Sequence, residues 1–201
     1  DEGDTLLNIY NECVKAGSPD LPIIFTSTSK ITFPGAGVAV EAASPNNVAL
    51  LKGRMKYQTI GPDKLNQLRH ARMFRTVSDI ERHMKRHAAI LRPKFETVEK
   101  ELQKQLGDTG VAHWTTPKGG YFISLYVLEG CAKRVEQLCA NAGMILTPAG
   151  ATYPYGTDPK DSNIRIAPSY PSVEEIEKAS EVLALAVRYA ALEKLLSDKE
   201  N

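Results

Sequence analysis

Apolar and polar residues alternate along this chain with periods that change from segment to segment. Between residues 78 and 106 apolar side chains return every three or four positions, which predicts one long amphipathic helix. The apolar runs at residues 21–26 and 38–42 have the length of buried strands. Residues 111–115 and 121–127 flank a turn that contains proline and glycine, and this pattern predicts a pair of antiparallel strands.

Capping residues indicate where the other helices begin and end. Asp4 can cap a helix that stops at Gly17, and Ser44 followed by Pro45 opens a helix that runs to about Arg54. The remaining expected elements are helices that open at Gly61, at about Cys131 and at the capping box Ser172-Val-Glu-Glu175, and short strands near Met144 and Ile164.

The expected fold class is α/β, with a division at about residue 80. Residues 1–80 are expected to be the end of a larger α/β domain that lacks its N-terminal part. Two strands and a few short helices cannot complete a layer in which parallel strands are covered on both faces. Residues 81–201 are expected to form a small α+β domain of helices on a small sheet.

Composition and charge narrow the class of protein. The chain has 201 residues, of which 42% are hydrophobic and 24% charged, as in ordinary globular proteins. Its formal net charge of +1 implies no basic face, so nucleic acid is not expected as a partner. No apolar run suits a membrane span and no signal segment is seen, so the cytoplasm is the expected location. The three cysteines include no CxxC pair and predict neither a disulfide framework nor a zinc site.

The strongest candidate for chemistry is Lys30, which follows the first predicted strand. A lysine amine can form a Schiff base with an aldehyde cofactor and can later transfer protons. The hydroxyls of Ser27 and Ser29 suit a phosphate, and Gly35 and Gly37 let the backbone fold closely around it. By spacing alone, however, a solvated lysine in a polar turn is the favoured interpretation.

Four motifs, in the same order as in the family, resemble the fold type I pyridoxal-phosphate-dependent aminotransferases. They are Ser27-Thr-Ser-Lys30 with Phe33-Pro34-Gly35, Pro117-Lys-Gly-Gly-Tyr-Phe122, Gly143-Met-Ile-Leu-Thr-Pro148-Ala-Gly150 and Asn163-Ile-Arg165-Ile-Ala-Pro168. Together they extend over almost the whole chain. The segments Thr26-Ser-Thr-Ser-Lys-Ile-Thr-Phe33 and Thr59-Ile-Gly-Pro-Asp-Lys-Leu-Asn-Gln-Leu-Arg-His70 more narrowly resemble the aspartate aminotransferase-like or MocR-type branch.

The resemblance implies a cofactor site around one lysine. Lys30 is then the residue that holds pyridoxal 5'-phosphate and acts as catalytic base, and Ser27 contacts the phosphate. By the hydroxyl and backbone arguments given above, Ser29, Gly35 and Gly37 are also expected to contact the cofactor. In family terms, the chain is the C-terminal half of such an enzyme: the end of the large cofactor-binding domain, followed by the small C-terminal domain.

The resemblance also implies substrates and a partner subunit. Arg165 then holds the substrate α-carboxylate through two parallel hydrogen bonds, a contact that lysine could not reproduce. The alternative for Arg165 is a surface arginine beside an edge strand. The implied substrates are an amino acid, with aspartate suggested by the nearest branch, and a 2-oxo acid. The implied assembly is a homodimer.

The chain departs from the family pattern at the phosphate site. Most relatives carry an arginine shortly after the Pro-Gly pair, where this chain has Ala36-Gly37-Val38. Another basic group, or backbone N–H groups with hydroxyls, are the candidates to replace it. Arg54 of a partner subunit is one such basic group, although a plain helix-terminal arginine is the favoured interpretation of Arg54. The family's acidic partner for the cofactor ring nitrogen lies upstream of the lysine, and nothing before Lys30 matches it. We therefore expect the chain alone to be inactive.

Three rival interpretations have less support. Ser27-Thr-Ser-Lys30 also fits the S-x-x-K pattern of serine acyl-transferases, but the S-D-N and K-T-G motifs that accompany it are missing. His83 and His87 share a helix face as metal ligands would, yet no third ligand is near, so no metal site is expected. A MocR-type transcription regulator would use the same fold as a ligand sensor instead of an enzyme.

Overall fold

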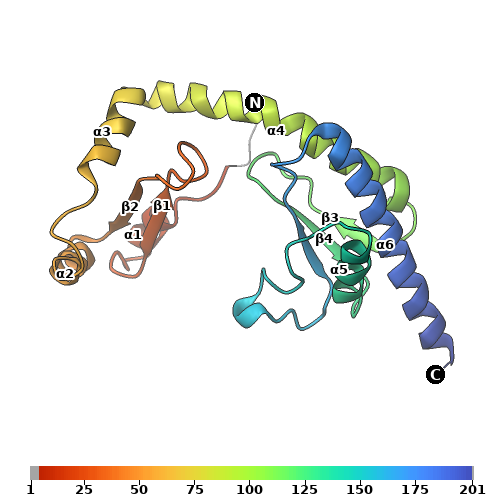
Figure 1. Cartoon of the computed structure of the whole chain (residues 1–201). Helices are drawn as coiled ribbons and strands as arrows, with labels where there is room; N and C mark the ends of the chain where they lie inside the picture. Colours follow the sequence, from red (N-terminus) through yellow and green to blue (C-terminus); the bar gives the residue numbers. More distant parts are fainter. Residues whose placement is uncertain (1–4, 201) are drawn as a thin grey trace. The chain divides into compact units, whose positions relative to one another are not determined.

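The computed structural model describes residues 5–200, which separate into two compact units. The N-terminal unit is Thr5–His87, and the C-terminal unit begins at Ala88. The boundary falls inside the long helix α4 (Val77–Leu106), in the yellow-green part of the chain in Figure 1. The mixed α/β fold class predicted from the sequence is confirmed, whereas the assignment of residues 1–80 and 81–201 to two enzyme domains stays a prediction.

The N-terminal unit is built on one β-hairpin, with one short helix before it and further helices after it. Besides the start of α4, its elements are α1 (Ile9–Lys15), β1 (Ile23–Ser27), β2 (Ala39–Ala43), α2 (Pro45–Met55) and α3 (Lys64–Met73). The two strands pair antiparallel, from Ile23 opposite Ala43 to Ser27 opposite Ala39. The expectation of parallel strands is therefore wrong for this pair, because the chain between them turns straight back.

Two further expectations for this unit are corrected. The strands are not buried, and Ser44 is the unit's single buried residue among those the structure describes. Helix α1 begins at Ile9 with Asn8 as its cap, whose side chain accepts the N–H of Asn11, so residues 5–8 are not helical. The cap predicted at Asp4 lies outside the described residues. The cap predicted at Ser44 is confirmed for α2.

The C-terminal unit packs helices against a three-stranded antiparallel sheet of order β3-β4-β5. Its elements after α4 are β3 (Ala112–Trp114), β4 (Ile123–Val127), α5 (Ala132–Asn141), a 3-10 turn (Pro154–Gly156), β5 (Asn163–Ile166) and α6 (Val173–Glu200). The predicted pairing of residues 111–115 with residues 121–127 is confirmed. No strand forms near Met144, whose N–H donates to the Cys139 carbonyl at 2.9 Å, and farther along this loop the N–H of Ala149 donates to the Glu136 carboxylate at 2.8 Å.

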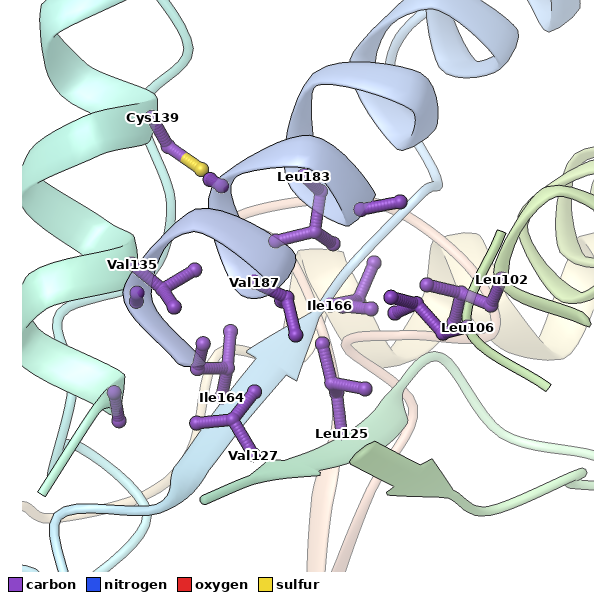
Figure 2. Packing of buried hydrophobic residues seen from close by; sticks show 14 of the residues in the cluster. Leu102, Leu106, Leu125, Val127, Val135, Cys139, Ile164, Ile166, Leu183 and Val187 are labelled. Atoms are coloured by element: carbon purple, nitrogen blue, oxygen red, sulfur yellow. The ribbon is translucent and has the colours of Figure 1, made fainter. Parts of the chain in front are cut away.

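The core of this unit lies between the helices and one face of the sheet. Figure 2 shows Val135 of α5 and Val187 of α6 pointing toward Ile164 of β5 and Leu125 of β4. Alternate residues of β4 are buried, as expected for a strand with one face on a core. The last helix opens on the predicted capping box: Ser172 N–H donates to the Glu175 carboxylate at 2.7 Å, and Glu175 N–H donates to Ser172 Oγ at 3.2 Å.

Candidate active site

Lys30 lies on a tight turn in the connection between β1 and β2. We call residues 28–32 the lysine turn. The N–H groups of Ile31 and Thr32 both donate to the Thr28 carbonyl at 2.8 Å. The two ends of the connection are tied together, since Thr28 N–H donates to the Val38 carbonyl at 2.9 Å and Val38 N–H donates to Thr28 Oγ1 at 2.9 Å. The exposed Lys30 thus sits on a backbone with several hydrogen bonds of its own.

The two serine hydroxyls predicted to bind phosphate lie together beside Lys30. Ser27 Oγ and Ser29 Oγ are 2.7 Å apart, and the Ser29 N–H donates to Ser27 Oγ at 3.1 Å. Both residues are exposed, so their hydroxyls can also meet an anion from solvent. The paired hydroxyls and the lysine amine form a donor set suited to an aldehyde cofactor that carries a phosphate.

The two predicted glycines have different structural roles in this connection. Gly37 passes so close to Ser29 that a Cβ on it would collide with Ser29 Oγ and would lie 2.9 Å from the Ser29 backbone N. Gly35 has a φ of +74°, a left-handed conformation that side chains disfavour, while nothing lies near its missing Cβ. The structure therefore brings Ser27, Ser29 and Gly37 together, and Gly35 serves the turn of the backbone.

Arg165 belongs to the C-terminal unit, on the face of β5 opposite the core. Its neighbours Ile164 and Ile166 are buried, so the alternation of the strand directs Arg165 to the other side. The guanidinium carbon lies 4.6 Å from the centre of the Phe122 ring, a cation–π contact. Its Nε is buried and has no hydrogen-bond partner among the described residues. A half-buried guanidinium with an unused donor is suited to bind a carboxylate.

The strand that carries Arg165 is fixed by polar contacts of buried side chains. The Asn163 side chain donates to Ser124 Oγ at 2.8 Å and accepts from Thr152 Oγ1 at 2.7 Å. Ahead of the strand, the Asp158 carboxylate accepts the N–H groups of Ser162 and Asn163 at 2.8 and 2.9 Å. Burial acts to raise the pKa of Asp158, but these backbone donors outweigh burial and hold the pKa below its ordinary value.

Comparison with known proteins identifies the family. The family described as aspartate amino-transferase matches residues 1–199. An aspartate aminotransferase of Corynebacterium glutamicum is 46% identical over 193 residues, 96% of this chain and 45% of that protein. A crystal structure of an aspartate transaminase from C. glutamicum has a TM-score of 0.91 at 45% identity, covering 96% of this chain and 46% of that one.

A more distant likeness concerns the fold alone. LysN, an α-aminoadipate aminotransferase from Thermus thermophilus whose structure holds N-(5'-phosphopyridoxyl)-L-leucine, has a TM-score of 0.75 at 20% identity. It covers 94% of this chain and 48% of that one.

The match to the family over residues 1–199 and the relative that is 46% identical show that the chain belongs to the aspartate aminotransferase family. The resemblance read from its four motifs is confirmed. The chain spans about half the length of the curated relatives it matches.

Sequence reasoning missed three residues around the lysine turn. Thr28, Thr32 and His70 form a hydrogen-bonded group there, and the sequence indicates all three only as members of family-like segments. Neither threonine carries a signal of its own, because any polar turn can contain threonine. The link to His70 depends on a contact 38 residues apart in the chain, which local patterns do not reveal.

Two other expectations concern metals and membranes. The rings of His83 and His87 are 4.4 Å apart, but residues 5–200 include no group of three or more side chains able to hold a metal ion. Among the helices of the same residues, none is both long enough and apolar enough to cross a membrane.

Proposed function

We propose that this chain is the C-terminal half of a pyridoxal-phosphate-dependent aminotransferase, in which Lys30 carries the cofactor. Family membership together with the position of Lys30 supports the proposal: Lys30 lies on a hydrogen-bonded turn and directly follows Ser29, whose hydroxyl pairs with that of Ser27. The LysN structure holds N-(5'-phosphopyridoxyl)-L-leucine, a molecule that contains the phosphopyridoxyl group of this cofactor.

Each proposed role follows from the chemistry of the side chain. Lys30 Nζ would hold the cofactor, and the same amine could take up the proton lost by the substrate α-carbon. Ser27 and Ser29 hold the phosphate with their hydroxyls, and Gly37 keeps the backbone close to Ser29. Bound pyridoxal phosphate supplies the electron sink for this proton removal.

The substrates and the assembly are part of the same proposal. Arg165 binds the α-carboxylate of an amino acid or of a 2-oxo acid through its guanidinium group. Aspartate is the amino acid suggested by the Corynebacterium relative. We propose a cytoplasmic homodimer on the strength of the family resemblance, with Arg54, exposed in the last turn of α2, available to a partner subunit's phosphate site.

The regulator interpretation is less well supported than the enzyme. The relative that is 46% identical to this chain is named as an aminotransferase, and it is similar over 96% of the chain. Because the chain spans about half of that relative, we also propose that these residues alone do not transaminate above the rate of free cofactor. Turnover at an enzyme rate by the isolated chain would contradict this proposal.

Covalent trapping in the full-length protein tests the assignment of Lys30. Borohydride reduction of the protein loaded with pyridoxal phosphate, followed by peptide mapping, should place the pyridoxyl group on Lys30. Lys52, Lys56 and Lys64, which are exposed lysines of the same unit, serve as internal controls for nonspecific labelling. Labelling of one of these in place of Lys30 would refute the assignment. Lys30→Ala should abolish turnover and leave thermal stability close to that of the wild type, because the exposed side chain contributes nothing to the core.

A further inference from the structure

Helix α3 is fastened to the lysine turn through the imidazole of His70. His70 Nε2 lies 2.7 Å from Thr32 Oγ1 and 3.3 Å from Thr28 Oγ1. These two threonines are the first and last residues of the lysine turn, with Lys30 midway between them. One ring nitrogen therefore contacts both ends of the five-residue segment that carries the amine.

The hydrogen bonds of this group determine which ring nitrogen carries the hydrogen. His70 Nδ1 lies 2.9 Å from the Asn66 carbonyl oxygen, which can only accept, so Nδ1 is the donor. In the neutral imidazole Nε2 is then an acceptor. Thr32 has one hydroxyl hydrogen, and Nε2 at 2.7 Å is a nearer acceptor for it than Thr28 Oγ1 at 3.0 Å or the Thr28 carbonyl at 3.2 Å. Thr28 Oγ1 lies 3.0 Å from Thr32 Oγ1 and accepts the Val38 N–H at 2.9 Å. The two threonine hydroxyls, the His70 ring and the backbone of α3 at Asn66 thus form one hydrogen-bonded network.

Other contacts limit the freedom of the ring and of the connection. The Phe33 ring meets the His70 ring edge-on, with centres 5.2 Å apart and planes at 80°. One helical turn earlier on α3, the Asn66 side chain donates to the Gly37 carbonyl at 3.2 Å. Thr28, Thr32 and His70 are all half-buried, so water competes less for these hydrogen bonds than it would on an open surface.

We propose that His70 is a positioning residue for Lys30: through Thr32 and Thr28 it holds the lysine turn, and hence the amine, in the geometry that receives the cofactor. This inference rests on the proposed function, in which Lys30 bears pyridoxal phosphate. His70 makes no contact with the cofactor in this role. It acts through the acceptor at its ε position, while the Nδ1 bond to Asn66 orients the ring.

Variants of His70 that keep or remove a hydrogen-bond acceptor at the position of Nε2 test the inference in the full-length protein. Glutamine can present an amide oxygen near the position of Nε2, asparagine can reach only the position of Nδ1, and leucine presents no acceptor. The first readout, made without cofactor, is hydrogen–deuterium exchange of the peptide that covers the lysine turn. The second is the rate at which pyridoxal phosphate becomes attached to Lys30, measured by borohydride quenching and peptide mapping. The third is kcat and KM.

We expect His70→Leu and His70→Asn to speed exchange in the lysine turn and to slow attachment at Lys30 about three- to tenfold, the size of one lost hydrogen bond. The attachment rate of His70→Gln should stay within about twofold of the wild-type rate, because glutamine keeps an acceptor near the position of Nε2. A twofold change is smaller than the effect of one lost hydrogen bond. In His70→Leu and His70→Asn kcat should fall, while KM stays near that of the wild type because the substrate contacts are unchanged. Thr32→Val should reproduce the defect, and combining it with His70→Leu should add little, because the two changes remove the same bond.

His87→Leu is the matched control, because His87 is also half-buried and packs on another histidine ring, in the same unit. It should leave attachment at Lys30 unchanged even if it lowers the melting temperature. Equal attachment and exchange rates in all His70 variants, or a glutamine variant as slow as the leucine variant, would overturn the inference. If His70→Leu does not fold, the comparison of His70→Gln with His70→Asn and Thr32→Val still tests the inference. A wild-type protein that is not labelled at Lys30 would instead refute the proposed function. Hydrogen–deuterium exchange in the lysine turn would then still test whether His70 holds the turn.

Discussion

Replacing Gly37 by alanine tests how closely the backbone must fold beside the lysine turn. The added Cβ would collide with Ser29 Oγ and lie 2.9 Å from both Cα and N of Ser29. Two of these three neighbours are backbone atoms, so the collision cannot be relieved by rotating a side chain. Ser29 is bonded directly to Lys30, and its hydroxyl pairs with Ser27. Any relief of the collision therefore moves the candidate site itself.

The size of the effect follows from the overlap. Nonbonded carbon atoms pack best about 3.5–4.0 Å apart, so one backbone segment must move by about 0.5 Å or more. Overpacking of this kind costs about 1–3 kcal/mol. If that cost falls on the conformation that binds cofactor, the affinity for pyridoxal phosphate drops roughly 5- to 150-fold, since about 1.4 kcal/mol corresponds to a factor of ten.

Spectrophotometric titration of the full-length protein with pyridoxal phosphate measures this loss, and thermal unfolding measures the effect on stability. Gly53→Ala is the matched control, because Gly53 lies inside α2 and nothing is within 4 Å of its missing Cβ. That substitution should leave the affinity unchanged and stabilise the helix by about 0.5–1 kcal/mol. Cofactor affinity of the Gly37→Ala protein within about twofold of the wild type, well below the expected 1 kcal/mol, would refute the reasoning.

Three further predictions concern the C-terminal unit. Arg165→Lys keeps the charge but loses the bidentate contact with a carboxylate, so kcat/KM of the full-length enzyme should fall by about one to two orders of magnitude; unchanged kinetics would exclude the proposed role. Leu125→Ala empties a fully buried site in β4 and should lower the free energy of unfolding in urea by about 2–5 kcal/mol. Burial raises the pKa of the Cys139 thiol from 9.0 to about 11. The folded state therefore keeps a proton that the unfolded state loses, so stability is full below pH 9.0 and falls as the pH rises toward 11. Urea unfolding of Cys139→Ala should show a smaller decline over this interval.

The elements that local signals define were predictable from the sequence. The apolar spacing of residues 78–106 predicts α4, because a helix repeats every 3.6 residues wherever it occurs. Ser44 with Pro45, and Ser172 with Glu175, predict two helix starts, because a cap satisfies N–H groups only a few residues away. The motifs around Lys30 and Arg165 indicate the family in the same way, since each motif is contiguous in the chain.

Only the tertiary structure decided the features that depend on contacts between distant segments. Sequence periodicity could not distinguish an antiparallel hairpin from parallel strands for β1 and β2, nor show that both strands are exposed in this chain. Strand alternation shows which face Arg165 occupies, but its packing on Phe122 depends on the fold of the sheet. The contact of His70 with Thr32 joins residues 38 positions apart. Such contacts are set by how whole elements pack, because no local pattern records which distant side chain will meet a given hydroxyl.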